Sequence, residues 1–301
     1  YAFGVAPLAN LGHEVTEEEA AAALEAAWSV GVRYFDTAPH YGLGLGERRL
    51  GTFLATKPRD EFVLSTKVGR VLVDNPLGVR PDDEGFDVRS PLVRRLDYSA
   101  DGVRRSLDDS LERMGLDRID VVFVHDPDEF YRESMEGAFP ALDELRREGV
   151  IASYGAGMNQ SAMLTNFVLN TDLDVVMCAG RYTLLEQGAL DDLLPAASAR
   201  GVSVIAAAVF NSGLQARDTR VGADYQPRAI RLRLGAREAG PPDERGLIGG
   251  DSDPHDVDGS DDHGASSFVG SGASARSRPA KARSAQSESG MGRSKRRALR
   301  R

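Results

Sequence analysis

The sequence is short of cysteine and of long apolar runs, and both shortages exclude whole classes of protein. Its 301 residues include a single cysteine, Cys178, so no internal disulfide can form. No apolar run approaches the roughly 20 residues that span a bilayer, and no signal peptide is visible. The net charge of −9 argues against nucleic acid as the main partner of the folded part. We therefore predict a cytoplasmic protein that binds neither membranes nor nucleic acid.

Aromatic residues are almost absent from the C-terminal part of the chain. Between Gln226 and Arg301 the only one is Phe268, and an acidic block there is followed by a basic one. Such a composition buries too little apolar area to offset the entropy of ordering the chain. We predict a folded domain over 1–216 and a low-complexity, disordered tail over 217–301. The tail is either the product of a shifted reading frame or a genuine, divergent extension.

Before that tail, strand-like apolar runs alternate with helical segments. The capping box of Thr16 and Glu19, for example, predicts the start of the first helix. The predicted strands are Tyr1–Leu8, Val32–Asp36, Phe62–Lys67, Asp120–His125, Ala152–Gly157, Asp174–Cys178 and Gly201–Val209. The predicted helices cover about 16–28, 46–54, 99–114, 134–148, 162–170 and 190–200. This alternation is typical of an α/β protein with a (β/α)₈ TIM barrel.

Two stretches depart from the regular alternation. The tail shows no periodicity for an eighth strand beyond a weak apolar run at Gly246–Ile248, so strand eight is predicted to be missing or replaced. The segment Gly69–Asp97 is long, polar and rich in Pro and Asp. A loop of this length inside a compact domain is usually functional or disordered. Trp28, in the first helix, is expected to belong to the core.

Four polar side chains stand at or near the ends of predicted strands. Asp36, Lys67 and His125 each close one, and Tyr41 follows Asp36 on the next loop. In a parallel barrel these ends meet on the catalytic rim. A phenol, with a pKa of about 10 in water, needs a nearby cation to work near neutrality. The set is suited to proton transfer at a carbonyl oxygen, but a hydride must come from a cofactor such as a nicotinamide.

Other interpretations of these residues exist. Singly, Asp36 is a candidate helix cap, Lys67 half of an ion pair, and His125 a backbone partner. Lys67 is also a candidate Schiff-base lysine in an aldolase-type barrel. A third hypothesis is a catalytically impaired or regulatory barrel that binds a cofactor. The occurrence of all four side chains on one predicted rim favours an enzyme.

Several motifs together resemble those of the aldo-keto reductase superfamily. They lie at 35–42, 46–51, 65–70 and 124–128. Within the superfamily, three further segments are similar to the group of D-threo-aldose 1-dehydrogenases and L-fucose dehydrogenases. These segments are 156–160, 180–187 and 209–214. The resemblance covers about residues 1 to 225 and implies the barrel fold of that superfamily.

The resemblance also implies a role for each matching residue. Tyr41 is the proton donor or acceptor, Lys67 and Asp36 lower its pKa, and His125 places the substrate oxygen. For the cofactor, the implied binding residues are Asn159, Tyr182, Asn211, Ser212, Gly213 and Leu214. Ala179 stands where many relatives have a glutamine that also binds the carboxamide.

The activity implied is an oxidoreductase that uses NADP or NAD, with no metal. The expected reaction is oxidation of an aldose at C1 to a lactone, or reduction of a small aldehyde, with Tyr41 as general acid or base. His40 and the segment Gly69–Asp97 are expected to shape the pocket for the small-molecule sugar or aldehyde. The family's eighth strand binds the adenosine end of the cofactor and has no match in the tail. If the tail comes from a shifted reading frame, the barrel is left open, which predicts low stability and weak cofactor binding.

Overall fold

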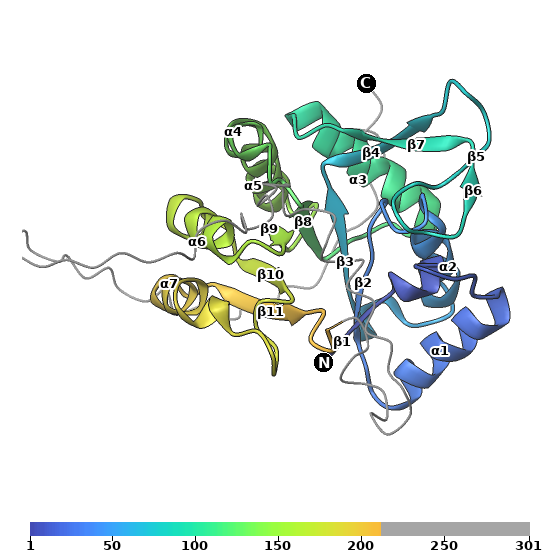
Figure 1. Ribbon diagram of the computed structural model, residues 1–301, viewed down its shortest axis with the longest axis horizontal. Coiled ribbons are helices and arrows are strands. Elements are labelled where there is room, and N and C mark those ends of the chain that lie inside the picture. The colour runs from blue at the N-terminus through green and yellow to red at the C-terminus, as the bar shows by residue number, and fades with distance from the viewer. Residues whose placement is uncertain (212–301) are drawn as a thin grey trace, which may run out of the picture. The chain divides into compact units, whose positions relative to one another are not determined.

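A computed structural model describes residues 1–211, and its main sheet has the predicted topology (Figure 1). Seven strands pair in parallel, and their order in the sheet is their order in the chain. They are β1 (Ala2–Gly4), β2 (Tyr34–Asp36), β3 (Val63–Val68), β8 (Val121–His125), β9 (Ser153–Met158), β10 (Val175–Ala179) and β11 (Ser203–Ala207). Sequential parallel strands joined by helices are the topology of the (β/α)₈ barrel, so the predicted fold class is confirmed.

The helices connect successive strands and pack against the sheet. They are α1 (Glu17–Ser29), α2 (Leu45–Leu54), α3 (Ala100–Met114), α4 (Tyr131–Glu133), α5 (Phe139–Glu148), α6 (Ser161–Asn170) and α7 (Leu193–Arg200). Short turns of 3₁₀ helix lie at η1 (Pro7–Ala9), η2 (Arg59–Glu61) and η4 (Gly188–Leu190), and a π-helical turn, η3 (Ser134–Ala138), precedes α5. No helix within residues 1–211 is long and apolar enough to cross a membrane.

Local sequence signals explain where the helices begin and end. The capping box of Thr16 and Glu19 is formed at the start of α1. Ser99 caps α3, where its side chain accepts a hydrogen bond from the backbone of Gly102. Gly115 ends that helix in the left-handed conformation, with φ of 64°. These caps satisfy backbone groups that a helix end leaves unpaired.

Two predicted segments differ from the structure. The first strand is shorter than predicted, because Pro7 begins the 3₁₀ turn η1 and ends the extended run. The segment Gly69–Asp97 is folded rather than an irregular loop. It forms two antiparallel ribbons, β4 (Arg70–Asp74) with β7 (Leu92–Leu96), and β5 (Arg80–Pro81) with β6 (Arg89–Ser90). We call this segment the β4–β7 insertion.

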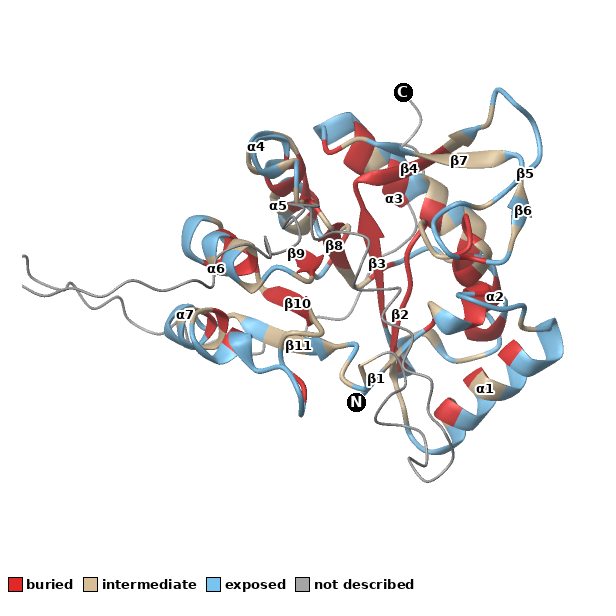
Figure 2. Ribbon diagram, in the orientation of Figure 1, coloured by how far each residue is buried: buried red, intermediate tan, exposed pale blue. Residues whose placement is uncertain are grey.

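The core lies between the sheet and its helices, as the buried strands and inner helix faces in Figure 2 show. Trp28 is only partly buried and packs at the edge of this core, stacked on Phe35 with ring centroids 6.3 Å apart. The guanidinium of Arg33 covers its ring at 3.8 Å from the centroid. Trp28, which was predicted to belong to the core, therefore lies at its periphery.

Several predictions concern residues outside the described range 1–211. They are the disordered tail over 217–301, the missing eighth strand and the weak apolar run at Gly246–Ile248. The domain boundary at residue 216 also falls there, so it stays a prediction.

Candidate active site

Adjacent strands bring the predicted catalytic side chains to one edge of the sheet. Asp36 and His125 are the last residues of β2 and β8, and Lys67 is the second-last residue of β3. The strand β3 pairs with both neighbours, so Asp36 is in register with Ser65, and Lys67 with Phe123. The parallel register places all three ends at the same rim (Figure 1).

A buried ion pair joins β2 to β3 beneath this rim. The Lys67 ammonium donates hydrogen bonds to Asp36 Oδ2 at 2.6 Å and to the Thr37 carbonyl at 2.8 Å. Ser65 Oγ donates to the other carboxylate oxygen of Asp36 at 2.7 Å. The side chain of Lys67 is 2% exposed and that of Asp36 9% exposed. Both charges are therefore held in one geometry and shielded from water.

Tyr41 lies against this pair. The Lys67 ammonium is 4.7 Å from the centroid of the Tyr41 ring. Burial raises the pKa of the Tyr41 hydroxyl above its ordinary value, the positive charge of Lys67 lowers it in part, and the charge of Asp36 raises it. The direct effect of the Asp36 charge on the pKa of Tyr41 is thus opposite to that of Lys67. Asp36 acts on the phenol indirectly, because its carboxylate holds the lysine in place, as a carboxylate behind the lysine is expected to do.

Lys67 remains a cation in this environment. Burial by itself lowers the pKa of its ammonium, but Asp36 and Tyr41 act against burial, and the net pKa lies above the ordinary value for lysine. A permanent positive charge beside the Tyr41 phenol stabilises the phenolate whenever that anion forms. Lys67 therefore acts as a fixed positive charge beside the phenol rather than as a proton carrier.

The loop that carries Tyr41 is shaped by close backbone packing. The backbone amide of Tyr41 donates to the Ala38 carbonyl at 3.1 Å, and the Tyr41 carbonyl accepts from the Gly46 amide at 3.1 Å. Gly42 has a φ of +60°, and a Cβ there would lie 2.5 Å from the carbonyl oxygen of Ala9. Glycine is therefore required directly after Tyr41 for the loop to approach η1.

A second buried charge fixes helix α2 against β3. The Glu47 side chain is fully buried, accepts a hydrogen bond from Thr66 Oγ1 at 2.9 Å and pairs with Arg113 Nε at 2.6 Å. Thr66 is the neighbour of Lys67, and Glu47 follows the Tyr41 loop. The network therefore fixes the position of the Tyr41 loop relative to Lys67.

His125 closes the other side of the site. Its ring centroid lies 5.9 Å from that of Tyr41, with the two planes at 88°. Asp126, the next residue, has a φ of +42°, which is unusual for a residue other than glycine. Tyr98 donates from its hydroxyl to the carbonyls of both residues, at 2.7 Å and 3.1 Å. The turn after β8 is therefore held tightly.

The β4–β7 insertion provides a wall over Tyr41 and His40. Phe86 is buried, and its ring lies 5.2 Å from His40 and 6.1 Å from Tyr41 between centroids. Arg94 donates to the His40 carbonyl at 2.9 Å and pairs with Asp82. The predicted pocket residue His40 therefore lies between the insertion and the reacting side chains, 5.5 Å from the ring of His125.

The residues predicted to bind the nicotinamide follow the next three strands. Asn159 comes after β9, Tyr182 after β10 and Asn211 after β11. The Tyr182 side chain is exposed, as a ring that stacks on a ligand must be, and Arg181 donates to the Asn159 carbonyl at 3.0 Å. All three residues follow strands of the same parallel sheet, and their role in binding a nicotinamide stays a prediction. Ala179 ends β10, and the predicted phosphate loop Ser212–Leu214 lies outside the described residues.

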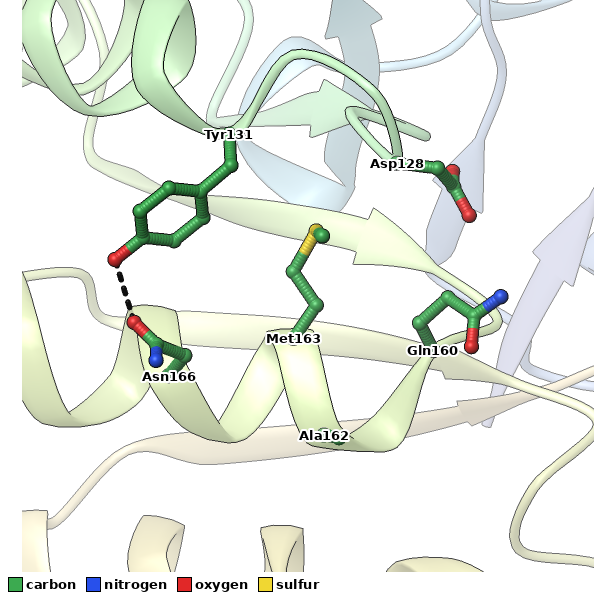
Figure 3. A pocket seen from close by; sticks show the side chains of 6 residues that line it. All are labelled: Asp128, Tyr131, Gln160, Ala162, Met163 and Asn166. Carbon is green, nitrogen blue, oxygen red and sulfur yellow. Dashed lines mark hydrogen bonds between the residues drawn. The ribbon is translucent and has the colours of Figure 1, made fainter.

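A separate groove lies between α4 and α6, away from the four catalytic candidates. It has a volume of about 480 Å³. Figure 3 shows its lining, in which the Tyr131 hydroxyl donates to Asn166 at 2.5 Å, to one side of Met163. Asp128 and Gln160 stand at its other end. None of the predicted site residues lines this groove.

Sequence reasoning missed the residues that support the site. Ser65, Phe86, Arg70 and Asp126 were assigned no role, although Ser65, Arg70 and Asp126 belong to the quoted motifs. The sequence did contain one signal for the role of the insertion. The segment starts at Gly69, just after Lys67 and Val68 at the rim end of β3. A polar segment that leaves a barrel at that end is well placed to cover the active site.

Comparisons with known proteins agree with this geometry. The profile of the aldo/keto reductase family matches residues 2–235. A D-threo-aldose 1-dehydrogenase from a Pseudomonas species is 50% identical over 220 residues, covering 71% of this chain and 67% of the relative. A pyridoxal 4-dehydrogenase from Microbacterium luteolum is 40% identical over 231 residues, covering 71% and 67%. The matches thus span about two thirds of each relative's own length.

A solved structure supports the fold. The glycerol dehydrogenase from Gluconobacter oxydans superposes with a TM-score of 0.59 over 80% of this chain and 68% of that one. Its sequence identity is 22%, so it is similar in fold alone.

Proposed function

Since this chain belongs to the aldo/keto reductase family, we propose that it is a nicotinamide-dependent oxidoreductase acting on sugars or small aldehydes. The observation that carries the proposal is the packing of the Tyr41 phenol against the buried Lys67–Asp36 pair, with His125 on its other side. A phenol, an adjacent cation and an imidazole are the groups needed to move a proton at a carbonyl or hydroxyl oxygen.

In this proposal Tyr41 transfers the proton. Its hydroxyl gives a proton to the carbonyl oxygen in reduction and takes one from the substrate hydroxyl in oxidation. The Lys67 ammonium stabilises the negative charge on the phenol oxygen during either transfer. His125 donates a hydrogen bond to the same substrate oxygen and orients it. None of these side chains carries electrons.

The hydride is the contribution of a bound nicotinamide, NAD or NADP. Asn159 would hold its carboxamide and Tyr182 would stack on its ring; both follow strands of the sheet that also carries Asp36, Lys67 and His125. Asn211, at a φ of +47°, begins the turn that would meet the phosphates.

The favoured substrate is an aldose, which is oxidised at C1 to a lactone. The names of the two curated relatives support this class, since one is a D-threo-aldose 1-dehydrogenase and the other acts on the aldehyde pyridoxal. The polar insertion over His40 supports it as well, because a sugar offers many hydroxyls for hydrogen bonds. A small aldehyde reduced in the reverse direction is the second candidate.

The geometry argues against a Schiff-base aldolase. A lysine that attacks a carbonyl must be neutral and reachable. Lys67 is 2% exposed, its pKa is raised, and its ammonium hydrogens point to Asp36 and Thr37. Borohydride trapping of substrate on Lys67 is the observation that would revive this alternative.

The proposal is tested by following reduction of NAD⁺ and NADP⁺ with L-fucose, D-arabinose, L-galactose and pyridoxal. Activity with at least one is expected. Tyr41→Phe removes only the hydroxyl, so kcat should fall by about 10²–10⁴-fold or more, while cofactor binding measured by calorimetry stays nearly unchanged. Wild-type-like turnover by the variant rejects the role of Tyr41. Cofactor binding without turnover of any substrate would favour the regulatory barrel instead.

A further inference from the structure

A carboxylate that the proposed mechanism does not use stands beside the reacting groups. Asp126 Oδ2 lies 3.7 Å from His125 Nε2, and the charge of Asp126 contributes to raising the pKa of Tyr41. Its side chain is 26% exposed, whereas that of His125 is 8% exposed. Asp126 Oδ2 therefore lies beside the imidazole nitrogen that, in the proposed mechanism, binds the substrate oxygen.

The β4–β7 insertion holds this carboxylate in place. Arg70 Nη2 donates to Asp126 Oδ2 at 3.3 Å, and Arg70 Nη1 donates to Glu84 Oε2 at 3.4 Å. The Arg70 side chain is only 7% exposed, so its position is fixed by packing. Glu84 in turn lies 3.7 Å from His40 Nδ1. The carboxylate thus belongs to a charged network that joins the insertion to the turn after β8.

The backbone at Asp126 supports the same conclusion. Its left-handed φ of +42° directs the chain differently from an ordinary strand end, and Pro127 follows it. The conformation is maintained by the two hydrogen bonds from Tyr98 and by the bond from the Asp126 amide to the Gly157 carbonyl at 3.0 Å. Strained backbone of this kind is concentrated at functional sites.

We propose that Asp126 binds the substrate hydroxyl next to the reacting carbon, and so selects 2-hydroxyaldehydes and aldoses over plain aldehydes. A substrate oxygen that accepts from His125 Nε2 lies close to Asp126, and two acceptors side by side repel each other. A hydroxyl on the neighbouring carbon relieves this repulsion, because it can donate a hydrogen bond to the carboxylate, which only accepts them. This inference rests on the proposed function, and it identifies the hydroxyl next to the reacting carbon as the group that the site recognises.

The test compares two substrates that differ by one hydroxyl. Reduction of 2-hydroxypropanal and of propanal is measured with NADH and NADPH for the wild type, Asp126→Asn and Asp126→Gly. Asparagine and glycine both tolerate a positive φ, so neither variant strains the turn. Asp126→Asn removes the negative charge of the side chain, and Asp126→Gly removes the whole hydrogen-bond acceptor. Asp128→Asn, on the same loop but facing the separate groove, is the matched control.

The wild type should prefer 2-hydroxypropanal by kcat/KM. A hydrogen bond to a charged group is worth enough that Asp126→Asn should reduce this preference by about tenfold or more, with a larger loss for Asp126→Gly. Removing the carboxylate also changes the charge beside His125 and Tyr41 for both substrates, so the ratio of the two kcat/KM values is the quantity compared. Asp128→Asn should keep the wild-type ratio.

Two outcomes count against the inference in different ways. Equal losses with both substrates, or no wild-type preference, overturn the role of Asp126 while leaving the oxidoreductase intact. A wild type inactive on both aldehydes and on the sugars rejects the proposed function and this inference with it. Melting curves of all variants confirm that the compared proteins are folded.

Discussion

Replacing Asp36 by asparagine removes one charge of the buried pair with almost no change in shape. Lys67 would then keep the Thr37 carbonyl as a partner at 2.8 Å but lose the carboxylate at 2.6 Å. The amide oxygen of asparagine can still accept the bond that Ser65 Oγ now donates at 2.7 Å. The substitution therefore isolates the ionic part of the interaction.

The structure sets the size of the effect. Both side chains are at most 9% exposed, so water cannot take over the role of the lost carboxylate. Breaking a buried pair by removing one partner costs about 3–5 kcal/mol, because the other charge stays buried. A domain is stable by about 5–15 kcal/mol in total, so this is a large share.

The pH dependence follows from the direction of the lysine shift. The pKa of Lys67 is raised on folding, so its contribution is fully present below the unfolded lysine pKa of about 10.4. It is lost only as the pH rises through the higher pKa of the folded state. The contribution of the wild-type pair to stability should therefore be undiminished between pH 7 and pH 9.

Urea denaturation measures the loss. With an m-value of about 3 kcal/mol/M, the midpoint should fall by about 1 M or more. Glu25→Gln is the control, since Glu25 pairs with Lys57 at 2.7 Å but is 60% exposed, and such pairs contribute about 1 kcal/mol or less. Equal small shifts for both variants would refute the reasoning that burial makes the Asp36–Lys67 pair important.

Two further predictions concern pH and packing. Because the pKa of Tyr41 is raised, its hydroxyl stays protonated from pH 7 to 9, and the rate of carbonyl reduction should not change over this range. The rate of oxidation, which needs the phenolate, should rise over the same range, and a falling rate would contradict this. Gly69→Ala should cost about 1–3 kcal/mol or more in thermal denaturation, because φ is +102° and the Cβ would lie 2.3 Å from the Tyr98 ring. Gly78→Ala, with φ of +71° and open space around it, should cost less.

The barrel and the four catalytic candidates follow from patterns that the sequence shows directly. A strand in a parallel sheet is an apolar run, and a polar residue such as His125 at its end is conspicuous. Caps are equally local, which is why the box of Thr16 and Glu19 was predicted correctly. The parallel order of the strands then brings residues such as Asp36 and Lys67 together without any further information.

The insertion was not predictable in the same way. Its ribbons are short, and β5 and β6 have two residues each, so no periodicity marks them. What orders the segment is a set of long-range contacts, such as the Gly12 amide to the Gly85 carbonyl at 2.9 Å. The size of the pKa shift at Tyr41 could not be predicted either, because it depends on burial and on the distances to Lys67 and Asp36.

The insertion and the barrel depend on each other at the turn after β8. Tyr98 reaches the carbonyls of His125 and Asp126 only because Gly69, whose φ is +102°, has no side chain in the path of its ring. Arg70, the next residue, pairs with the Asp126 carboxylate. Gly69, which follows β3, therefore begins the insertion. It also allows the contacts that hold Asp126, in its left-handed backbone conformation, beside the imidazole of His125. A change in the insertion should thus alter which substrates are bound before it alters the buried Asp36–Lys67 pair, because the hydrogen bonds of the pair come from β2, β3 and Thr37.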